Sequence, residues 1–197
     1  RTMSDLDILY ESNKRKSVKN ILKSLGYNCD KMTSKDDEYS KPPFMNVEMH
    51  RIMVDSGFEK IADYYKNIWD VVKPSIDNPY IYEMTNEDFY IHMIAHIARH
   101  YSVECIGIRF VFDEWLYLKK FGDVLNFDYI NNELEKIGLL LFANNFKNMT
   151  VKWFTNEEMT DLEKDMTEYI FKSSTHGSVV NEQSLKLAVG QEGIDNF

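Results

Sequence analysis

The sequence lacks the features of disulfide-rich, membrane-spanning and nucleic-acid-coating proteins. Its 197 residues include two cysteines, Cys29 and Cys105, which are too few for a disulfide scaffold and fit a reduced cytoplasmic protein better. No apolar run approaches the roughly 20 residues of a membrane-spanning helix, and no signal peptide is recognisable. Acidic residues outnumber basic ones by 32 to 23, and the resulting net charge of -9 disfavours broad binding of nucleic acid, which needs a basic surface. We therefore expect a cytoplasmic protein without a membrane or nucleic-acid partner.

Hydrophobic periodicity divides the sequence into two parts. The first part has strand character at residues 4–9 and 44–52, a helix at 17–25 that ends at Gly26 in a left-handed cap, and a polar loop at 30–43. The second part has the period of helices, which we expect at residues 58–72, 85–100, 108–120, 128–145 and 156–171, with a last short one at 184–189. Thr85 and Asp88 resemble the capping pair of a helix start. The sequence thus predicts an α+β protein with a small α/β unit at residues 1–56 and a helical domain at residues 57–197.

Two aspartates stand one residue apart in the first predicted strand, Ser4-Asp5-Leu6-Asp7-Ile8-Leu9. Successive side chains of a strand point to opposite faces, so Asp5 and Asp7 share one face. Two carboxylates this close repel each other unless a cation lies between them, and hard divalent ions prefer oxygen ligands. Glu48 offers a third carboxylate from the second predicted strand, on the same face as His50. If the two strands are neighbours, Asp5, Asp7 and Glu48 form a metal site for Mg²⁺ or Mn²⁺.

The order of these segments resembles a known family. The similarity is carried by Arg1-x-x-Ser4-Asp5-Leu6-Asp7-Ile8-Leu9, Leu25-Gly26-Tyr27, Val47-Glu48-Met49-His50, Ile94-x-His96-x-x-x-His100, Gly107-Ile108-Arg109 and Asp113. These segments are similar to uncharacterised bacterial nucleotidyltransferases of the DNA polymerase beta-like superfamily, over about residues 1–120. The resemblance implies a small mixed β-sheet nucleotidyltransferase core, followed by a mainly α-helical domain that completes the cleft. It also implies that Asp5, Asp7 and Glu48 are the catalytic and metal-binding carboxylates.

The activity implied by the resemblance is a metal-dependent transfer of a nucleoside monophosphate from a nucleoside triphosphate to a hydroxyl of a small molecule or protein. The acceptor stays open. Arg1 and Ser4 are expected to contact the phosphates, although a flexible terminal residue is an equal interpretation of Arg1. Members of the family carry a Gly-Ser turn shortly upstream of the Asp-x-Asp strand. That turn would precede Arg1, so we expect an N-terminal portion to be missing from this sequence.

The histidines of the second part allow several interpretations. His92, His96 and His100 follow one another at four-residue steps and so share one side of a predicted helix, with His92 expected to be the most exposed. They could form a Zn²⁺ site, form hydrogen bonds to Arg109 or Asp113 across a helix interface, or line the acceptor side of the cleft. The resemblance favours a polar cluster that faces the cleft and consists of His50, His96, His100, Arg109 and Asp113.

Three functions follow from these patterns. We expect a magnesium-dependent nucleotidyltransferase. The alternative is a catalytically silent protein of the same fold that acts as a binding or regulatory module. A histidine-based metal hydrolase depends wholly on the predicted helix that carries the three histidines.

Overall fold

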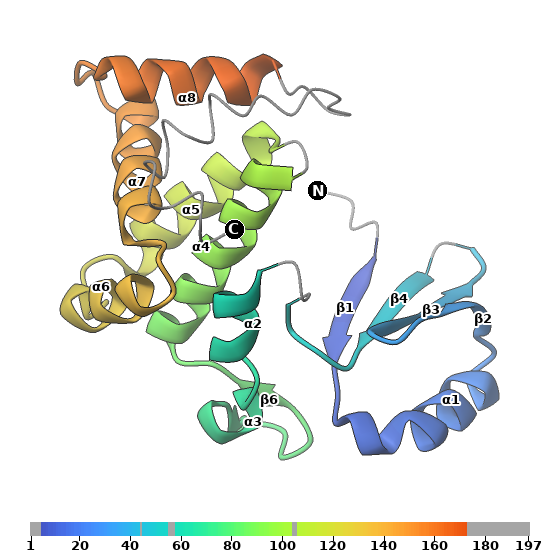
Figure 1. Cartoon of the computed structure of the whole chain (residues 1–197). Helices are drawn as coiled ribbons and strands as arrows, with labels where there is room; N and C mark the ends of the chain where they lie inside the picture. Colours follow the sequence, from blue (N-terminus) through green and yellow to red (C-terminus); the bar gives the residue numbers. More distant parts are fainter. Residues whose placement is uncertain (1–4, 44, 55–57, 104–105, 173–197) are drawn as a thin grey trace. The chain divides into compact units, whose positions relative to one another are not determined.

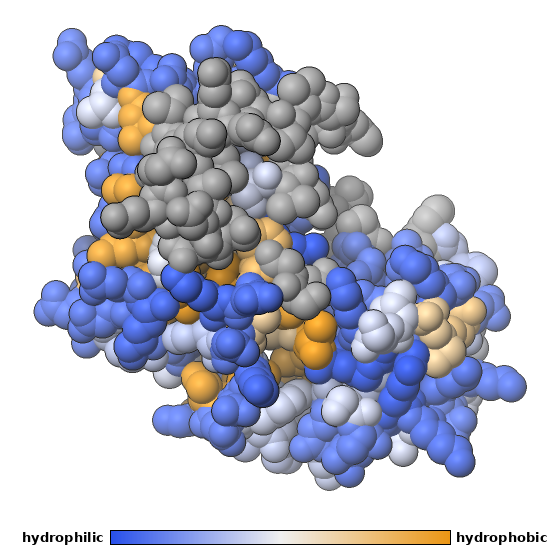
Figure 2. Space-filling view, viewed as in Figure 1, coloured by the Kyte–Doolittle hydropathy of each residue, from blue (hydrophilic) through white to orange (hydrophobic). Residues whose placement is uncertain are grey.

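The structure is a computed structural model that describes residues 5–43, 45–54, 58–103 and 106–172 (Figure 1). The chain divides into two compact units, Arg1–Ser56 and Gly57–Phe197. On the side drawn in Figure 2, hydrophilic residues cover most of the first unit, and the hydrophobic residues gather mainly over the second. No helix in the described ranges has both the length and the apolar character needed to cross a membrane.

The first unit is a four-stranded sheet with one helix beside it (Figure 1). Its elements in chain order are β1 (Leu6–Leu9), the 3-10 helix η1 (Ser12–Lys14), α1 (Arg15–Ser24), β2 (Asn28–Met32), β3 (Asp36–Lys41) and β4 (Met45–His50). The strands lie in the order β1-β4-β3-β2. Strands β1 and β4 pair in parallel, and the other two pairs are antiparallel. The predicted small mixed sheet is therefore confirmed.

One face of this sheet is covered by α1. Tyr39, Val47 and Met49 point toward the helix and are buried with Tyr10, and the partly buried Val18 and Leu22 of α1 pack against them. The helix ends as predicted, because Gly26 adopts a φ of 85° and the amide of Tyr27 donates to the carbonyl of Leu22. Tyr39, Val47 and Met49 are thus covered within the unit, whereas Leu6 and Ile8 of β1, on the same face, remain 46% and 37% exposed.

The prediction of a polar loop at residues 30–43 was wrong. These residues form most of the antiparallel hairpin of β2 and β3. The segment is polar because its exposed face carries charged side chains that pair between strands, as Lys31 Nζ does with Glu38 Oε1 at 2.9 Å. Its inward face places Asp37 and Tyr39 in the interior, where Asp37 is held by two arginines. Because a charged residue, Asp37, takes a buried position in β3, the segment lacks the alternation of apolar and polar residues that predicts a strand.

The second unit is mainly helical. Its elements are α2 (Glu59–Tyr64), α3 (Ile68–Val71), the two-residue strands β5 (Lys73–Pro74) and β6 (Tyr82–Glu83), α4 (Asn86–Val103), α5 (Ile108–Phe121), α6 (Phe127–Lys136), α7 (Leu140–Phe154) and α8 (Asp161–Lys172). The predicted start of α4 is confirmed, since the hydroxyl of Thr85 accepts from the amide of Asp88 at 3.1 Å. The core is built from large side chains that include Tyr90, Ile94, Tyr101, Phe142 and Phe146.

Three predicted helices have different limits. The helix expected at 58–72 is two short helices, because Asn67 leaves the helical conformation (φ −109°, ψ 39°) and the turn buries both Tyr65 and Ile68. The helix expected at 128–145 is divided into α6 and α7 by Gly138, whose φ of 75° ends α6 in the same type of cap as Gly26.

The helix expected at 156–171 begins only at Asp161. Thr160 and Glu163 exchange side-chain and backbone hydrogen bonds, at 2.6 Å from the Thr160 amide and 3.3 Å from the Glu163 amide. This arrangement is a capping box, which fixes the helix start. The short helix expected at 184–189 lies outside the described residues.

Candidate metal-binding and catalytic site

Two carboxylates meet on the open face of the sheet. In the parallel pairing of β1 with β4, Asp7 is directly opposite Glu48. Val47 and Met49 point toward α1, so the alternation of the strand turns Glu48 and His50 to the other face. The neighbouring strands expected from the sequence are therefore present, and they bring together side chains 41 residues apart in the chain.

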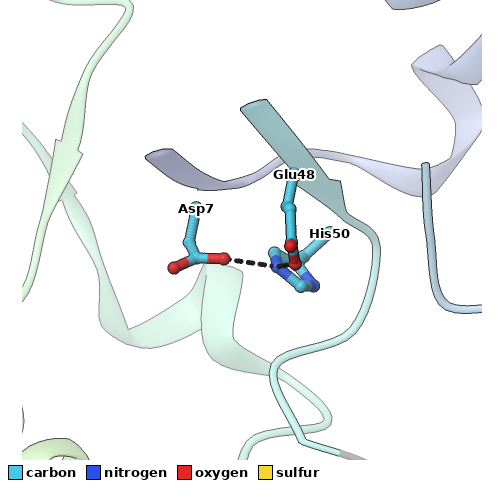
Figure 3. A group of neighbouring side chains, drawn as sticks. All are labelled: Asp7, Glu48 and His50. Atoms are coloured by element: carbon cyan, nitrogen blue, oxygen red, sulfur yellow. Dashed lines mark hydrogen bonds and ion pairs between the residues drawn. The ribbon is translucent and has the colours of Figure 1, made fainter. Parts of the chain in front are cut away.

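His50 completes this group (Figure 3). Its Nε2 lies 2.8 Å from Asp7 Oδ1 and 3.5 Å from Glu48 Oε2. One ligand atom from each of the three residues lies within 4.8 Å of the others. Within the described ranges, no other group of three histidine, cysteine or carboxylate ligands is this close. Asp7 is exposed, whereas Glu48 and His50 are half-buried, so the group is open to a ligand from solvent.

The electrostatics of the group favour a cation. Burial raises the pKa of the Glu48 carboxyl, and the nearby charges of Asp7 and Asp5 raise it further, although His50 opposes them. A positive ion placed among these carboxylates would remove the repulsion that raises this pKa. The oxygens of Asp7 and Glu48 suit Mg²⁺ and Mn²⁺, and the imidazole nitrogen of His50 is a donor that transition ions accept more readily than Mg²⁺. The residues present therefore fit a divalent ion.

Asp5, which the sequence analysis includes among the metal ligands, lies one residue before β1 and is exposed. It is close enough to Glu48 to raise the pKa of that carboxyl, but it is not one of the three grouped ligands. His50, which the sequence analysis assigns to the polar cleft cluster, lies among them instead. Arg1 and Ser4 lie outside the described residues.

The predicted helix residues belong to α4 and α5 of the second unit. The rings of His96 and His100 lie against Phe110, with centroids 5.7 and 5.2 Å apart. These histidines therefore do contact the next helix, with an aromatic ring as one partner. Arg109 is exposed and Asp113 is half-buried. A role for these residues in a catalytic cleft stays a prediction.

The three histidines of α4 do not form a three-ligand metal group within the described residues. The ring centroids of His92 and His96 are 6.3 Å apart, and those of His96 and His100 are 4.4 Å apart. The expectation that His92 is the most exposed was wrong, because His92 is half-buried and His96 is exposed. Burial lowers the pKa of His92 to about 4, so this ring is neutral at pH 7. A histidine-based hydrolase at α4 therefore stays a prediction.

A buried ion pair supports the end of β4, and the sequence analysis missed it. Asp37 accepts from Arg15 at 2.5 Å and pairs with Arg51 Nη1 at 3.0 Å. Arg51 follows His50 directly and also donates to the carbonyl of Thr33 at 2.6 Å. These bonds fix the backbone next to His50. Neither charge spacing nor hydrophobic alternation signals them, because Asp37 lies in a segment that reads as a polar loop.

The chain was also compared with known proteins. The sequence profile of a family described as "Uncharacterised nucleotidyltransferase" matches residues 1–155. The match includes the whole sheet unit and continues through α7. Comparisons with curated proteins and with solved structures give no match.

Proposed function

The chain belongs to the uncharacterised nucleotidyltransferase family, and on that premise we propose that it is a metal-dependent enzyme that transfers a nucleoside monophosphate from a nucleoside triphosphate to a hydroxyl group. The observation that carries the proposal is the direct pairing of Asp7 with Glu48 on the open face of the sheet, with His50 beside them. The acceptor is a small molecule or a protein.

Each residue of the group has a proposed task. Asp7 and Glu48 hold the divalent ion, Mg²⁺ or Mn²⁺, and Asp5 contributes a further carboxylate from the position just before β1. His50 orients Asp7 through the contact of 2.8 Å and offers a nitrogen ligand. Arg15, Asp37 and Arg51 keep the end of β4 in place, as a positioning network outside the reacting atoms.

The proposed reaction is a displacement at phosphorus. The acceptor oxygen forms a bond to the α-phosphorus, the bond from that phosphorus to the bridging oxygen breaks, and pyrophosphate leaves. The proton of the acceptor hydroxyl passes to one of the site carboxylates. A bound divalent ion would neutralise phosphate charge and lower the pKa of the attacking hydroxyl. The three carboxylates could not approach a triphosphate without such neutralisation, since like charges repel.

Titration calorimetry with each nucleoside triphosphate, in the presence of Mg²⁺ or of a chelator, tests the proposal. The wild type should bind at least one triphosphate in a manner that depends on the metal, and Asp5→Asn and Asp7→Asn should lose this dependence. Asp30→Asn is the matched control, because Asp30 is an exposed aspartate of β2 in the same unit. Triphosphate binding that depends on neither the metal nor these two aspartates would instead identify a catalytically silent binding module.

A further inference from the structure

The basic residues of this acidic chain are concentrated on one helix of the sheet unit. Residues 14–23, which include most of α1, carry five of the 23 basic side chains and no acidic one. The chain as a whole has a net charge of -9, which disfavours binding of nucleic acid over a broad surface. A net charge does not describe a local surface, and α1 presents a basic surface in an otherwise acidic chain.

Three of these lysines form a ridge along the outer side of α1. Lys16, Lys19 and Lys23 follow one another at steps of three and four residues, so they lie within an arc of about 60° around the helix axis. Val18 and Leu22 are turned to the sheet instead and pack against its core. The ridge lysines and their polar neighbours are all exposed, and these residues are Lys16, Ser17, Lys19, Asn20, Lys23 and Ser24. The outer side of α1 therefore offers positive charge and hydrogen-bond donors.

The lysine ridge is not used in the packing of its own unit. Within the described residues, none of its three lysines has an ion-pair partner, and the hydrogen bond of Lys19 goes to the uncharged Sδ of Met32, at 3.4 Å. Arg15 differs, because it pairs with the buried Asp37. Helix stability does not account for Lys16 either, since a cation in the first turn lies at the positive end of the helix dipole. The ridge is consequently available to a partner of negative charge.

The residue types of the ridge fit a phosphate backbone better than a protein surface. Lysine and serine are depleted in interfaces between proteins, whereas lysine, serine and asparagine side chains contact phosphate oxygens in complexes with nucleic acids. Lys16 and Lys23 are seven residues apart, which is about 10 Å along the helix. One strand of a duplex has a phosphate for about every 3.4 Å of axis, so the ridge spans about three successive phosphates.

A membrane surface fits the ridge less well. A helix that binds a bilayer places large apolar residues where they can enter the lipid, with its basic residues beside them. The exposed apolar residues of this helix, Ile21 and Leu25, lie on the side of the axis away from the ridge. The position that lies between the lysines on the outer side is Asn20, which is polar.

We infer that the outer side of α1 is a docking surface for the phosphodiester backbone of a nucleic acid, bound without recognition of the bases. Each lysine of the ridge contacts one phosphate, and Asn20 donates a further hydrogen bond. The group of Asp7, Glu48 and His50 lies on the face of the sheet opposite α1, so the docked phosphates are not those at the metal. The inference is therefore independent of the proposed nucleotidyl transfer.

Fluorescence anisotropy with two labelled probes of mixed sequence tests the inference. The probes are a duplex DNA and a single-stranded RNA, each about 20 nucleotides long, and their comparison shows which backbone is preferred. At low ionic strength the full chain should bind at least one of them saturably. The logarithm of the association constant should fall with the logarithm of the salt concentration, with a slope of about −2 to −3 for three neutralised phosphates.

Replacement of the ridge should remove this binding without unfolding the protein. Lys16→Gln/Lys19→Gln/Lys23→Gln should weaken binding about tenfold or more and flatten the salt dependence. The matched control removes the same charge from exposed positions of the second unit, as Lys73→Gln/Lys119→Gln/Lys120→Gln. Thermal unfolding checks that each variant is folded. If the triple variant does not fold, single replacements give the same test, because each should reduce the slope by about one.

Poly-L-glutamate and vesicles of phosphatidylcholine with phosphatidylserine distinguish a nucleic acid from other anionic partners. Binding of either one as tightly as the nucleic acids would overturn the inference, because the surface would then fit an acidic protein or a membrane. An equal loss of binding in the two triple variants would overturn it as well, since net charge and not α1 would be responsible. A wild type that binds neither nucleic acid saturably at low ionic strength would also overturn it.

Discussion

His50 Nε2 lies 2.8 Å from Asp7 Oδ1, across the parallel pair formed by β4 and β1. The residue that ends one strand therefore fixes the carboxylate of the other. A histidine that contacts a ligand carboxylate both orients it and adds a donor of its own.

Replacement of His50 should weaken metal binding without unfolding the sheet unit. His50→Ala removes the contact with Asp7 and the nitrogen donor, and we expect Mn²⁺ affinity to fall by roughly 10- to 100-fold. Asn46→Ala is the control, because Asn46 is an exposed residue on the same face of β4. The measurement is a calorimetric Mn²⁺ titration. Equal affinities of His50→Ala and the wild type would exclude His50 from the site.

The pairing of Asp37 should make the first unit sensitive to acid. Burial raises the pKa of Asp37, but hydrogen bonds from Arg15 and Arg51 outweigh burial and hold it below its ordinary value. A carboxyl with a lowered folded pKa stabilises the fold above its unfolded pKa and loses this contribution as the pH falls through the folded value.

Asp37→Asn should therefore lower the free energy of unfolding at pH 7 by about 3 kcal/mol, because two arginines lose their charged partner. The difference from wild type should begin to shrink as the pH falls below about 4, where the carboxyl of the unfolded chain takes up a proton, and should disappear once the pH is below the lowered pKa of the folded state. Urea unfolding between pH 7 and pH 3 measures this, with Asp30→Asn as an exposed control. A difference that does not vary with pH would contradict the assignment.

The hairpin of β2 and β3 around Asp37 is the part of the sheet that the sequence did not predict. The strand at Asp7 and the strand at Glu48 were predictable, because each alternates apolar and polar residues. The hairpin at β2 and β3 was not, because its stability comes from cross-strand charges and from a buried ion pair between distant residues.

The candidate site was also only partly predictable, because contacts between residues far apart in the chain complete it. Strand alternation places Glu48 and His50 on one face, but only the register of β1 on β4 sets Asp7 opposite Glu48 and brings His50 to Asp7. Register depends on pairing across 41 residues, which no local pattern specifies.

Two of the missed helix limits could have been predicted from the sequence. Gly138 is a glycine cap like Gly26, and Thr160 with Glu163 is a capping pair like Thr85 with Asp88.

Glu114 should make the second unit less stable as the pH rises. It is fully buried in the helical core and accepts from the hydroxyl of Tyr90 at 2.9 Å. Burial raises its pKa to about 7 from an ordinary value of 4.5. The unfolded chain therefore loses this proton first, so stability declines between about pH 4.5 and pH 7 and is flat above.

Glu114→Gln keeps a polar group that can accept from Tyr90 and cannot ionise. We expect it to remove this decline and to raise stability at pH 8 relative to wild type, by on the order of 3 kcal/mol. Thermal unfolding monitored between pH 4 and pH 8 tests this. A wild-type profile that rises over this range, and a Glu114→Gln profile that follows it, would show that Glu114 is not the titrating group.

Gly26 should resist substitution because of its backbone and not because of its surroundings. Its φ of 85° is unfavourable for any residue with a Cβ, and an added Cβ would meet only the flexible end of Lys41, at 3.7 Å. Gly26→Ala should therefore cost roughly 1–2 kcal/mol. Gly107→Ala is the control, since Gly107 has a φ of −91° and no atom within 4 Å of an added Cβ. Equal stability of the two variants in denaturant unfolding would contradict this account.

The central claim is that Asp7 and Glu48 together hold a divalent ion that a nucleoside triphosphate needs for binding. Electron paramagnetic resonance of Mn²⁺, recorded with and without ATP or another triphosphate, tests this most directly. We predict saturable Mn²⁺ binding to wild type and to Asp30→Asn, tighter in the presence of triphosphate, and its loss in folded Asp7→Asn/Glu48→Gln. Mn²⁺ binding and its response to triphosphate that are the same in the double variant as in wild type would contradict the claim.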